Sequence, residues 1–75
     1  MEESFGSIKI GLEELIQKKG MSKNKVSNLA QMQRTQLNNY CKGKIQRIDL
    51  SILSRLCYAL DCSIEDILEY QPPTE

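Results

Sequence analysis

The sequence predicts an all-α protein with five helices in a single domain. Its 75 residues suffice for one hydrophobic core, since chains divide into several domains only at much greater lengths. The apolar residues include nine Leu and eight Ile but one Val, and there are only two Thr, which favours helices over strands. Apolar residues also recur three and four positions apart through most of the chain, as in helices that bury one face.

The N-terminal part of the chain predicts a tail followed by the first helix. Residues 1–7 are expected to form a flexible tail, and residues 8–10 alternate like a fragment of strand. A helix is expected over 11–19, because its apolar residues fall three and four apart and its last turn is basic. Gly20 suits the position that follows a helix C-terminus.

Two short helices follow, three residues apart. Ser22 is a candidate N-cap for a helix over 23–30, and Gly43 is placed to stop another over 34–42. Two short helices joined in this way can cross at a wide angle, so that the second lies in a DNA major groove while the first braces it. Apolar residues are present for the inner contacts that this angle needs: Val26, Ala30, Met32, Leu37 and Tyr40.

The C-terminal part predicts two more helices. Asp49 can cap a helix whose apolar side chains recur at helical spacing through Leu60. Residues 63–66 have the outline of a capping box for a last helix with Ile67 and Leu68 on its apolar edge, ended by two prolines. Residues 71–75 are expected to be a flexible tail, which leaves 8–70 as the folded domain.

Charge is sorted along the chain. Between Ile16 and Ile48 lie eight basic residues and no acidic one, whereas the rest of the chain holds all ten acidic residues and two basic ones. The net charge is zero, yet the chain is a dipole. Such sorting favours a basic face that binds a polyanion, the alternative being a basic surface that is merely solvated.

Composition argues against several other classes of protein. The chain has no His, the commonest general base and metal ligand, and is too short to enclose a sizeable substrate cavity. We therefore expect no enzyme, no catalytic residues, no cofactor or metal and no small-molecule substrate. Three Cys without a CxxC spacing indicate reduced thiols. With no apolar stretch near ~18 residues and no signal peptide at the start, we expect a cytoplasmic protein without a membrane partner.

The segment from Met21 to Gly43, MSKNKVSNLAQMQRTQLNNYCKG, resembles the helix-turn-helix of the Cro and phage-repressor type, also called the Xre family. The resemblance includes a basic-Gly step before a hydrophobic-Ser pair, over residues 19–22, and an aromatic residue and Gly at the end of the second helix. It extends over about residues 8–70, because the stretch 48–70 resembles the closing helices of small single-domain bacterial members. It implies a five-helix bundle of the lambda-repressor-like DNA-binding type, with the helix-turn-helix at about 22–42.

The chain departs from the family pattern at several positions. Gln31 stands where the family usually has Gly, so it must accept a left-handed conformation or adopt a different turn. Lys23 and Lys25 replace a usual Gln and a frequent acid. Cations in a first helical turn oppose the helix dipole, and a bound phosphate would reverse the sign of that effect.

The resemblance and side-chain chemistry together assign roles to the polar residues. Arg pairs well with guanine and Asn with adenine. The residues expected to contact bases are Gln33, Arg34, Thr35, Asn38 and Asn39. Polar and basic residues that lie on both sides of the recognition helix are expected to contact phosphates. These residues are Ser22, Lys23, Lys25, Lys42, Lys44 and Arg47.

The predicted function is sequence-specific binding of double-stranded DNA by a transcriptional regulator, a repressor, with helix 34–42 in the major groove. One recognition helix covers few base pairs, so a homodimer on half-sites ~34 Å apart is expected. Two dimer surfaces remain open: the C-terminal helix with Ile64, Leu68 and Tyr70, or residues 8–10 pairing within or between chains with the tail near Tyr70. The alternative function is a protein-interaction module or antitoxin-like adaptor. RNA binding ranks last, because readers of single strands stack bases on exposed aromatics and the basic residues 44–47 include no aromatic side chain.

Overall fold

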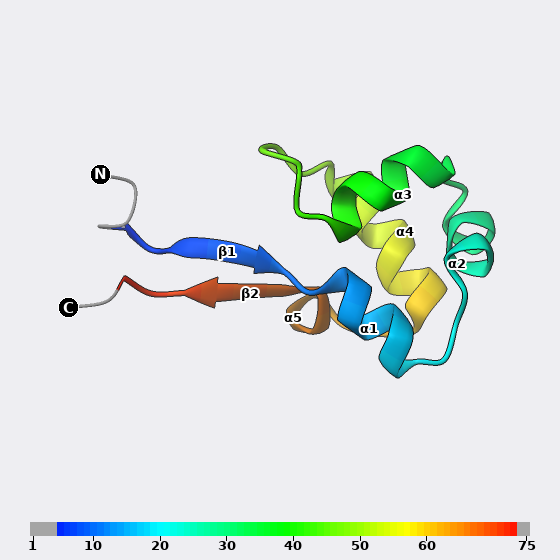
Figure 1. Ribbon diagram of the computed structural model, residues 1–75, viewed down its shortest axis with the longest axis horizontal. Helices are drawn as coiled ribbons and strands as arrows, with labels where there is room; N and C mark the ends of the chain where they lie inside the picture. Colours follow the sequence, from blue (N-terminus) through cyan, green and yellow to red (C-terminus); the bar gives the residue numbers. More distant parts are fainter. Residues whose placement is uncertain (1–4, 74–75) are drawn as a thin grey trace.

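The computed structural model describes residues 5–73, which form five helices around one core and a two-stranded ribbon at one end (Figure 1). The prediction of a mostly helical fold is therefore confirmed, and the prediction of an all-α fold holds only approximately. In chain order the elements are β1 Ser7–Ile10, α1 Leu12–Lys18, α2 Lys23–Ala30, α3 Arg34–Cys41, α4 Leu50–Leu60, α5 Ile64–Ile67 and β2 Leu68–Gln71.

The core lies between α4 and the helices around it. Asp49 caps α4 by accepting hydrogen bonds from the N–H groups of Ser51 and Ile52, as its position predicts. The helix then buries an apolar stripe that packs with Leu12 of α1, Val26 of α2 and Leu37 of α3. In Figure 1, α2 lies at one end of the helical body and α3 along its upper edge, with α4 behind them. The core thus holds α2 and α3 in a crossed arrangement.

The helices α1 to α4 all end in the same hydrogen-bonded turn. In each, a left-handed residue follows the helix, and the next N–H donates to the carbonyl five residues earlier, at 2.9 to 3.2 Å. Gly20 and Gly43 are the left-handed residues after α1 and α3, as predicted. After α4 it is Asp61, with φ 51°.

Gln31 accepts the left-handed conformation after α2, with φ 54° and ψ 50°. The turn between α2 and α3 therefore keeps its usual path without the usual glycine. Helix α4 stabilises this turn, because the Arg55 guanidinium donates a hydrogen bond of 3.1 Å to the Gln31 carbonyl. A hydrogen bond from a third helix, α4, thus helps to hold Gln31 in its strained conformation.

The C-terminal end of the chain corrects the sequence prediction. The capping box is present, with Ser63 and Asp66 exchanging the expected hydrogen bonds, but the helix that it starts ends at Ile67. Leu68–Gln71 is extended and pairs antiparallel with β1 in the same chain. The spacing of Ile64, Ile67 and Leu68 fits a helix, yet the backbone groups of residues 68–71 find their partners in β1 instead.

Residues 8–10 are the strand fragment that their alternation predicts, and their partner is the segment near Tyr70 within the same chain. The sheet is one pair longer than expected, because Ser7 and Gln71, which the sequence assigns to tails, pair with each other. Gly11 continues the connection by donating its N–H to the Ile67 carbonyl at 2.8 Å. The ribbon therefore joins the two ends of the domain and extends beyond the helices (Figure 1).

Candidate nucleic-acid interface

Helix α3 buries one face and exposes a polar one. Leu37 and Tyr40 are buried in the core. Of the predicted base-contacting residues, Gln33, Arg34, Thr35 and Asn39 are exposed, whereas Asn38 is half-buried on the flank of the helix. The prediction thus identified most of the polar face, with Asn38 less accessible than the other four.

Gln36 is a further exposed residue of this face that the sequence analysis missed. It lies three positions before Asn39 in α3, so these two side chains fall along one side of the helix, which begins directly after the N-cap Gln33. This spacing is the signal that would have identified it. Its amide can both donate and accept, like the amides around it.

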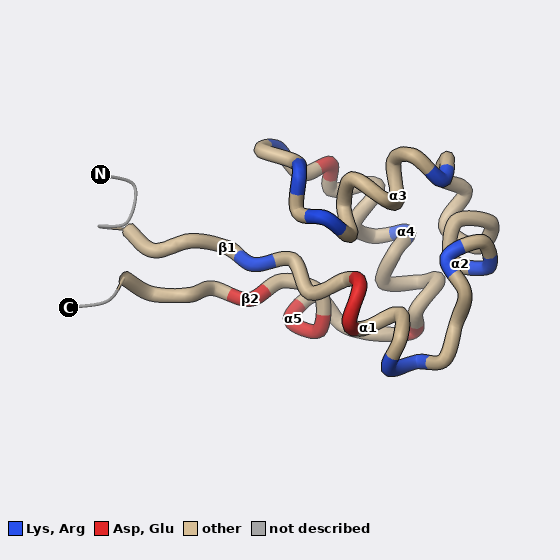
Figure 2. Tube along the Cα trace, viewed as in Figure 1, with Lys and Arg blue, Asp and Glu red and all other residues tan. Residues whose placement is uncertain are grey.

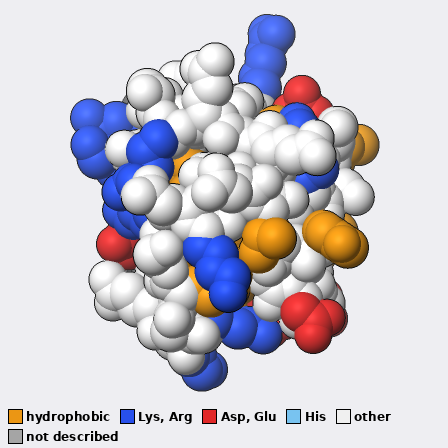
Figure 3. All heavy atoms as spheres, turned by 90° about the vertical axis from the view of Figure 1, so that its right-hand side faces the viewer, with side chains coloured by type: hydrophobic (Ala, Val, Ile, Leu, Met, Phe, Trp, Pro, Cys, Tyr) orange, Lys and Arg blue, Asp and Glu red, His pale blue; other side chains and the backbone are white. Residues whose placement is uncertain are grey.

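The predicted phosphate-contacting residues form two groups at opposite ends of the α2–α3 unit. Ser22, Lys23 and Lys25 lie at the start of α2, whereas Lys42, Lys44 and Arg47 follow α3. Figure 2 shows basic residues along α2, at the start of α3 and in the loop after it, and acidic residues mainly along α1, α5 and β2. The charge sorting along the sequence is therefore also a sorting in space. In the view onto the α2 end, basic side chains spread across the surface while acidic ones lie near its margins (Figure 3).

Ser22 is the N-cap of α2, as predicted. Its hydroxyl oxygen accepts a hydrogen bond of 3.1 Å from the Lys25 N–H. The hydroxyl hydrogen remains free to donate, so capping is compatible with a phosphate contact by the same side chain. Lys25 is exposed and forms no ion pair within residues 5–73.

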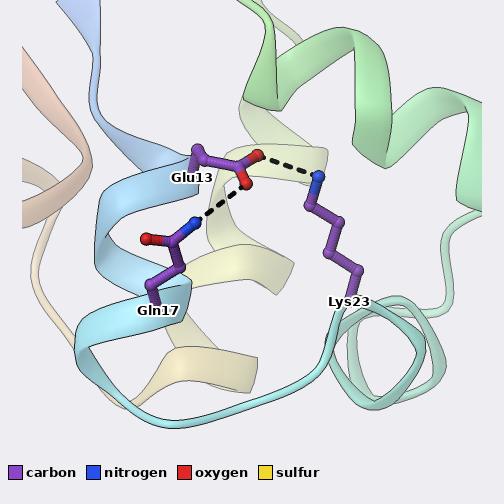
Figure 4. A network of polar contacts seen from close by, with 3 residues as sticks. All are labelled: Glu13, Gln17 and Lys23. Carbon is purple, nitrogen blue, oxygen red and sulfur yellow. Dashed lines mark hydrogen bonds and ion pairs between the residues drawn. The ribbon is translucent and has the colours of Figure 1, made fainter.

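Lys23 is paired within the chain. Its ammonium lies 2.8 Å from Glu13 of α1, and Gln17 donates a second hydrogen bond, of 3.2 Å, to the same carboxylate (Figure 4). The hydrogen bond from Lys23 holds the pKa of Glu13 below its ordinary value of 4.5. The positive charge of Lys23 is unfavourable at the positive end of the α2 dipole, and the carboxylate of Glu13 offsets this repulsion. A phosphate at this position would share Lys23 with Glu13.

Arg34 is held by a neighbouring helix. Its guanidinium donates a hydrogen bond to the side-chain oxygen of Asn24 in α2. The guanidinium has five N–H groups in a planar fork, so most of them stay free to bind a base or phosphate. No local sequence pattern relates two residues ten positions apart, and Asn24 was therefore not identified as part of the site.

The basic loop, residues 42–49 between α3 and α4, is anchored to the helical body. The buried Tyr40 hydroxyl accepts a hydrogen bond of 3.4 Å from the Asp49 N–H, and Ile45 packs against the core. These contacts hold the loop while Lys44 and Arg47 stay exposed on either side of Ile45. Tyr40 is thus the core residue that its type predicts.

The described part of the chain shows no group of three or more potential metal ligands, and none of its helices is long and apolar enough to cross a membrane. The three cysteines are free thiols. Burial, with Cys57 beside it, raises the pKa of Cys62 to about 11, so this thiol stays protonated near neutral pH.

Comparison with known proteins identifies the family. The family model described as the Cro/C1-type HTH DNA-binding domain matches residues 11–73, from the residue before α1 to beyond β2. The chain is also 33% identical, over 60 residues, to the SPbeta prophage-derived uncharacterized HTH-type transcriptional regulator YopS of Bacillus subtilis (strain 168). The match covers 77% of this chain and 78% of YopS. The chain therefore belongs to the Cro/C1-type helix-turn-helix family of DNA-binding transcriptional regulators.

Proposed function

We propose that the protein recognises a specific DNA sequence by inserting α3 into the major groove, and that it acts as a dimer to repress transcription. The observation that carries this proposal is the exposed polar face of α3, which lies between two groups of basic residues. Occupying an operator is enough to block a promoter, so a single DNA-binding domain can act as a repressor. The DNA partner makes the bacterial cytoplasm the expected location.

Base recognition would fall to the exposed polar residues of α3. Arg34 can bind the O6 and N7 atoms of guanine through the N–H groups that Asn24 leaves free. Gln33, Gln36 and Asn39 present amides that can form paired hydrogen bonds with adenine, each good pair contributing about 1 to 3 kcal/mol of discrimination. Thr35 can contact a thymine methyl group or a phosphate, and Asn38 would act from the flank of the helix.

Phosphate contacts would set affinity and register. The start of α2 offers its free N–H groups together with Ser22 and Lys25, and Lys23 where it is released from Glu13. On the other side of α3, the anchored basic loop provides three cations, Lys42, Lys44 and Arg47. The recognition helix would thus be clamped to the DNA backbone on both sides.

Salt dependence of binding tests this division of roles. If about 4 to 6 cations per protomer neutralise phosphates, log K for a duplex falls with log salt at a slope of about −4 to −5 per protomer. Lys44→Ala should reduce the slope by about one and weaken all sequences alike, whereas Asn39→Ala should change the preferred base. Lys9→Ala, on the ribbon, removes the same charge away from the site and should leave the slope unchanged. A flat salt response, or identical behaviour of Lys44→Ala and Asn39→Ala, would contradict the proposal.

A further inference from the structure

One cation of the basic surface is neutralised by the chain itself. Between Ile16 and Ile48 the sequence holds eight basic residues and no acidic one. Glu13 of α1 nevertheless reaches the start of α2, where its carboxylate lies 2.8 Å from the Lys23 ammonium (Figure 4). Within residues 5–73, Lys23 is the only one of these eight cations in an ion pair, because the other pair of the protein joins Lys9 to Glu14. The pairing therefore singles out one of the cations expected to contact a phosphate.

The carboxylate of Glu13 is held in a fixed position. One of its oxygens faces the Lys23 ammonium, and the other accepts a hydrogen bond of 3.2 Å from Gln17, one turn later in α1. The Cys41 thiol at the end of α3 also interacts with this carboxylate. Groups from α1, α2 and α3 thus surround it, and the Lys23 side chain is only 27% exposed. The pair is therefore better ordered than most surface ion pairs, which join two freely moving side chains.

Lys23 occupies the position where a phosphate would bind. It is the first residue of α2, directly after the N-cap Ser22. The first N–H groups of a helix lack intrahelical partners and, with the helix dipole, favour a negative charge nearby. Glu13 brings a carboxylate to the cation at this end of the helix. It supplies Lys23 with the negative charge that a DNA phosphate would otherwise supply.

We propose that Glu13 sets the affinity for DNA by competing with a phosphate for Lys23. The proposal rests on the proposed function, since it requires the start of α2 to face the DNA backbone. A phosphate that approaches Lys23 must displace the carboxylate or be repelled by it, and a lysine paired in this way gains little from binding DNA. The pair thus lowers the part of DNA affinity that does not depend on sequence, and the base contacts of α3 are unchanged.

A pair of neighbouring acidic residues provides the test and its matched control. Glu13→Gln releases Lys23, whereas Glu14→Gln removes the same charge from the next residue, whose carboxylate lies 3.8 Å from Lys9 of β1. Binding of the full chain to a fluorescent duplex of mixed sequence, about 20 base pairs long, is measured by anisotropy between about 50 and 200 mM salt.

Glu13→Gln should bind the duplex about 2- to 5-fold more tightly than the wild type at about 0.1 M salt. Its slope of log K against log salt should be steeper by about 0.9 per protomer, because one more cation neutralises a phosphate. Glu14→Gln should stay within about 1.5-fold of the wild type with an unchanged slope, since salt screens charges that lie outside the interface. Circular dichroism checks that each variant keeps the helical fold.

A double variant separates the release of Lys23 from the simple loss of a negative charge. Adding Lys23→Gln to Glu13→Gln replaces the ion pair by two neutral amides and should return the slope to that of the wild type. If Glu13 acted only through its charge, Glu13→Gln would tighten binding without changing the slope, which would overturn the proposal. Weaker binding by Glu13→Gln would do the same, because it would mean that Glu13 directs Lys23 toward the phosphate.

The same measurements separate this proposal from the proposed function. A wild type that binds the duplex with a steep salt dependence, and a Glu13→Gln variant that behaves identically, would refute the competition alone. If neither the wild type nor any variant bound the duplex at about 50 mM salt, the proposed function would fail together with it.

Discussion

Replacing Gln31 by Gly should stabilise the protein, although it removes a side chain. Gln31 is in the left-handed conformation, which costs a residue with a Cβ about 1 to 2 kcal/mol. Gly removes that strain. It also stabilises the unfolded chain by about 0.4 to 1 kcal/mol, because Gly has more conformational freedom there than Gln. The Gln31 side chain is exposed, so its loss sacrifices little packing. The expected net gain is about 0.5 to 1 kcal/mol.

The contacts that hold this turn do not depend on the Gln31 side chain. The Met32 N–H donates to the Ser27 carbonyl at 2.9 Å, and Arg55 donates to the carbonyl of Gln31 itself. Both acceptors are backbone atoms that the Gln31→Gly variant retains. The crossing of α2 and α3 should therefore be unchanged, and the variant should bind the same DNA sequence as the wild type.

Thermal unfolding followed by circular dichroism measures the effect. For a domain of this size, a gain of about 0.5 to 1 kcal/mol corresponds to a rise in Tm of roughly 2 to 8 °C. Gln36→Gly is the matched control, since it makes the same replacement at an exposed position inside α3 and should destabilise by about 0.5 to 1 kcal/mol. If Gln31→Gly lowered the Tm as the control does, the assignment of strain to this turn would be refuted.

Three further predictions concern the polar contacts and the thiols. Because the pKa of Glu13 is lowered in the folded protein, its ion pair with Lys23 stabilises the fold at pH values above the ordinary pKa of 4.5. This stabilisation is lost as the pH falls through the lowered pKa of the folded state. Urea unfolding from pH 7 to 3 should thus show less acid destabilisation in Glu13→Gln, and equal profiles would argue against a stabilising pair. Asn24→Ala should weaken the base preference set by Arg34 while general DNA affinity changes little. Selection of binding sites with the wild type and the variant measures this preference, and an unaltered preference would show that Asn24 does not position Arg34. Cys62, with a pKa of about 11, should react slowly with thiol reagents at neutral pH and faster as pH rises, so rapid labelling at pH 7 would be the contrary result.

Local patterns predicted most of the helical fold. The periodicity of apolar residues located α1 to α4, and single residues marked their ends: Ser22 and Asp49 as N-caps, Gly20 and Gly43 after the last turns. These signals work because capping and left-handed turns depend on the chemistry of one residue and its immediate neighbours. The polar face of α3 followed from the same periodicity.

Contacts between distant segments were not predictable in this way. Leu68, the first residue of β2, continues the helical spacing of Ile64 and Ile67, and only the distant partner β1 makes the strand the better solution. Glu13 and Asn24 each bind a basic residue ten positions away on another helix, an arrangement that depends on how the helices cross. Sequence reasoning thus selected polar and basic side chains, most of which are exposed around α2 and α3, but not the residues that hold them in place.

The central claim is that α3 reads a specific DNA sequence as one half of a dimer. Selection of binding sites from a random duplex library at near-physiological salt tests it most directly. We expect enrichment of two inverted half-sites about one helical turn apart, with Arg34→Ala and Asn39→Ala changing the bases within each half-site but not the spacing. A pool without enrichment would contradict the claim and favour a role in binding another protein through the same surface.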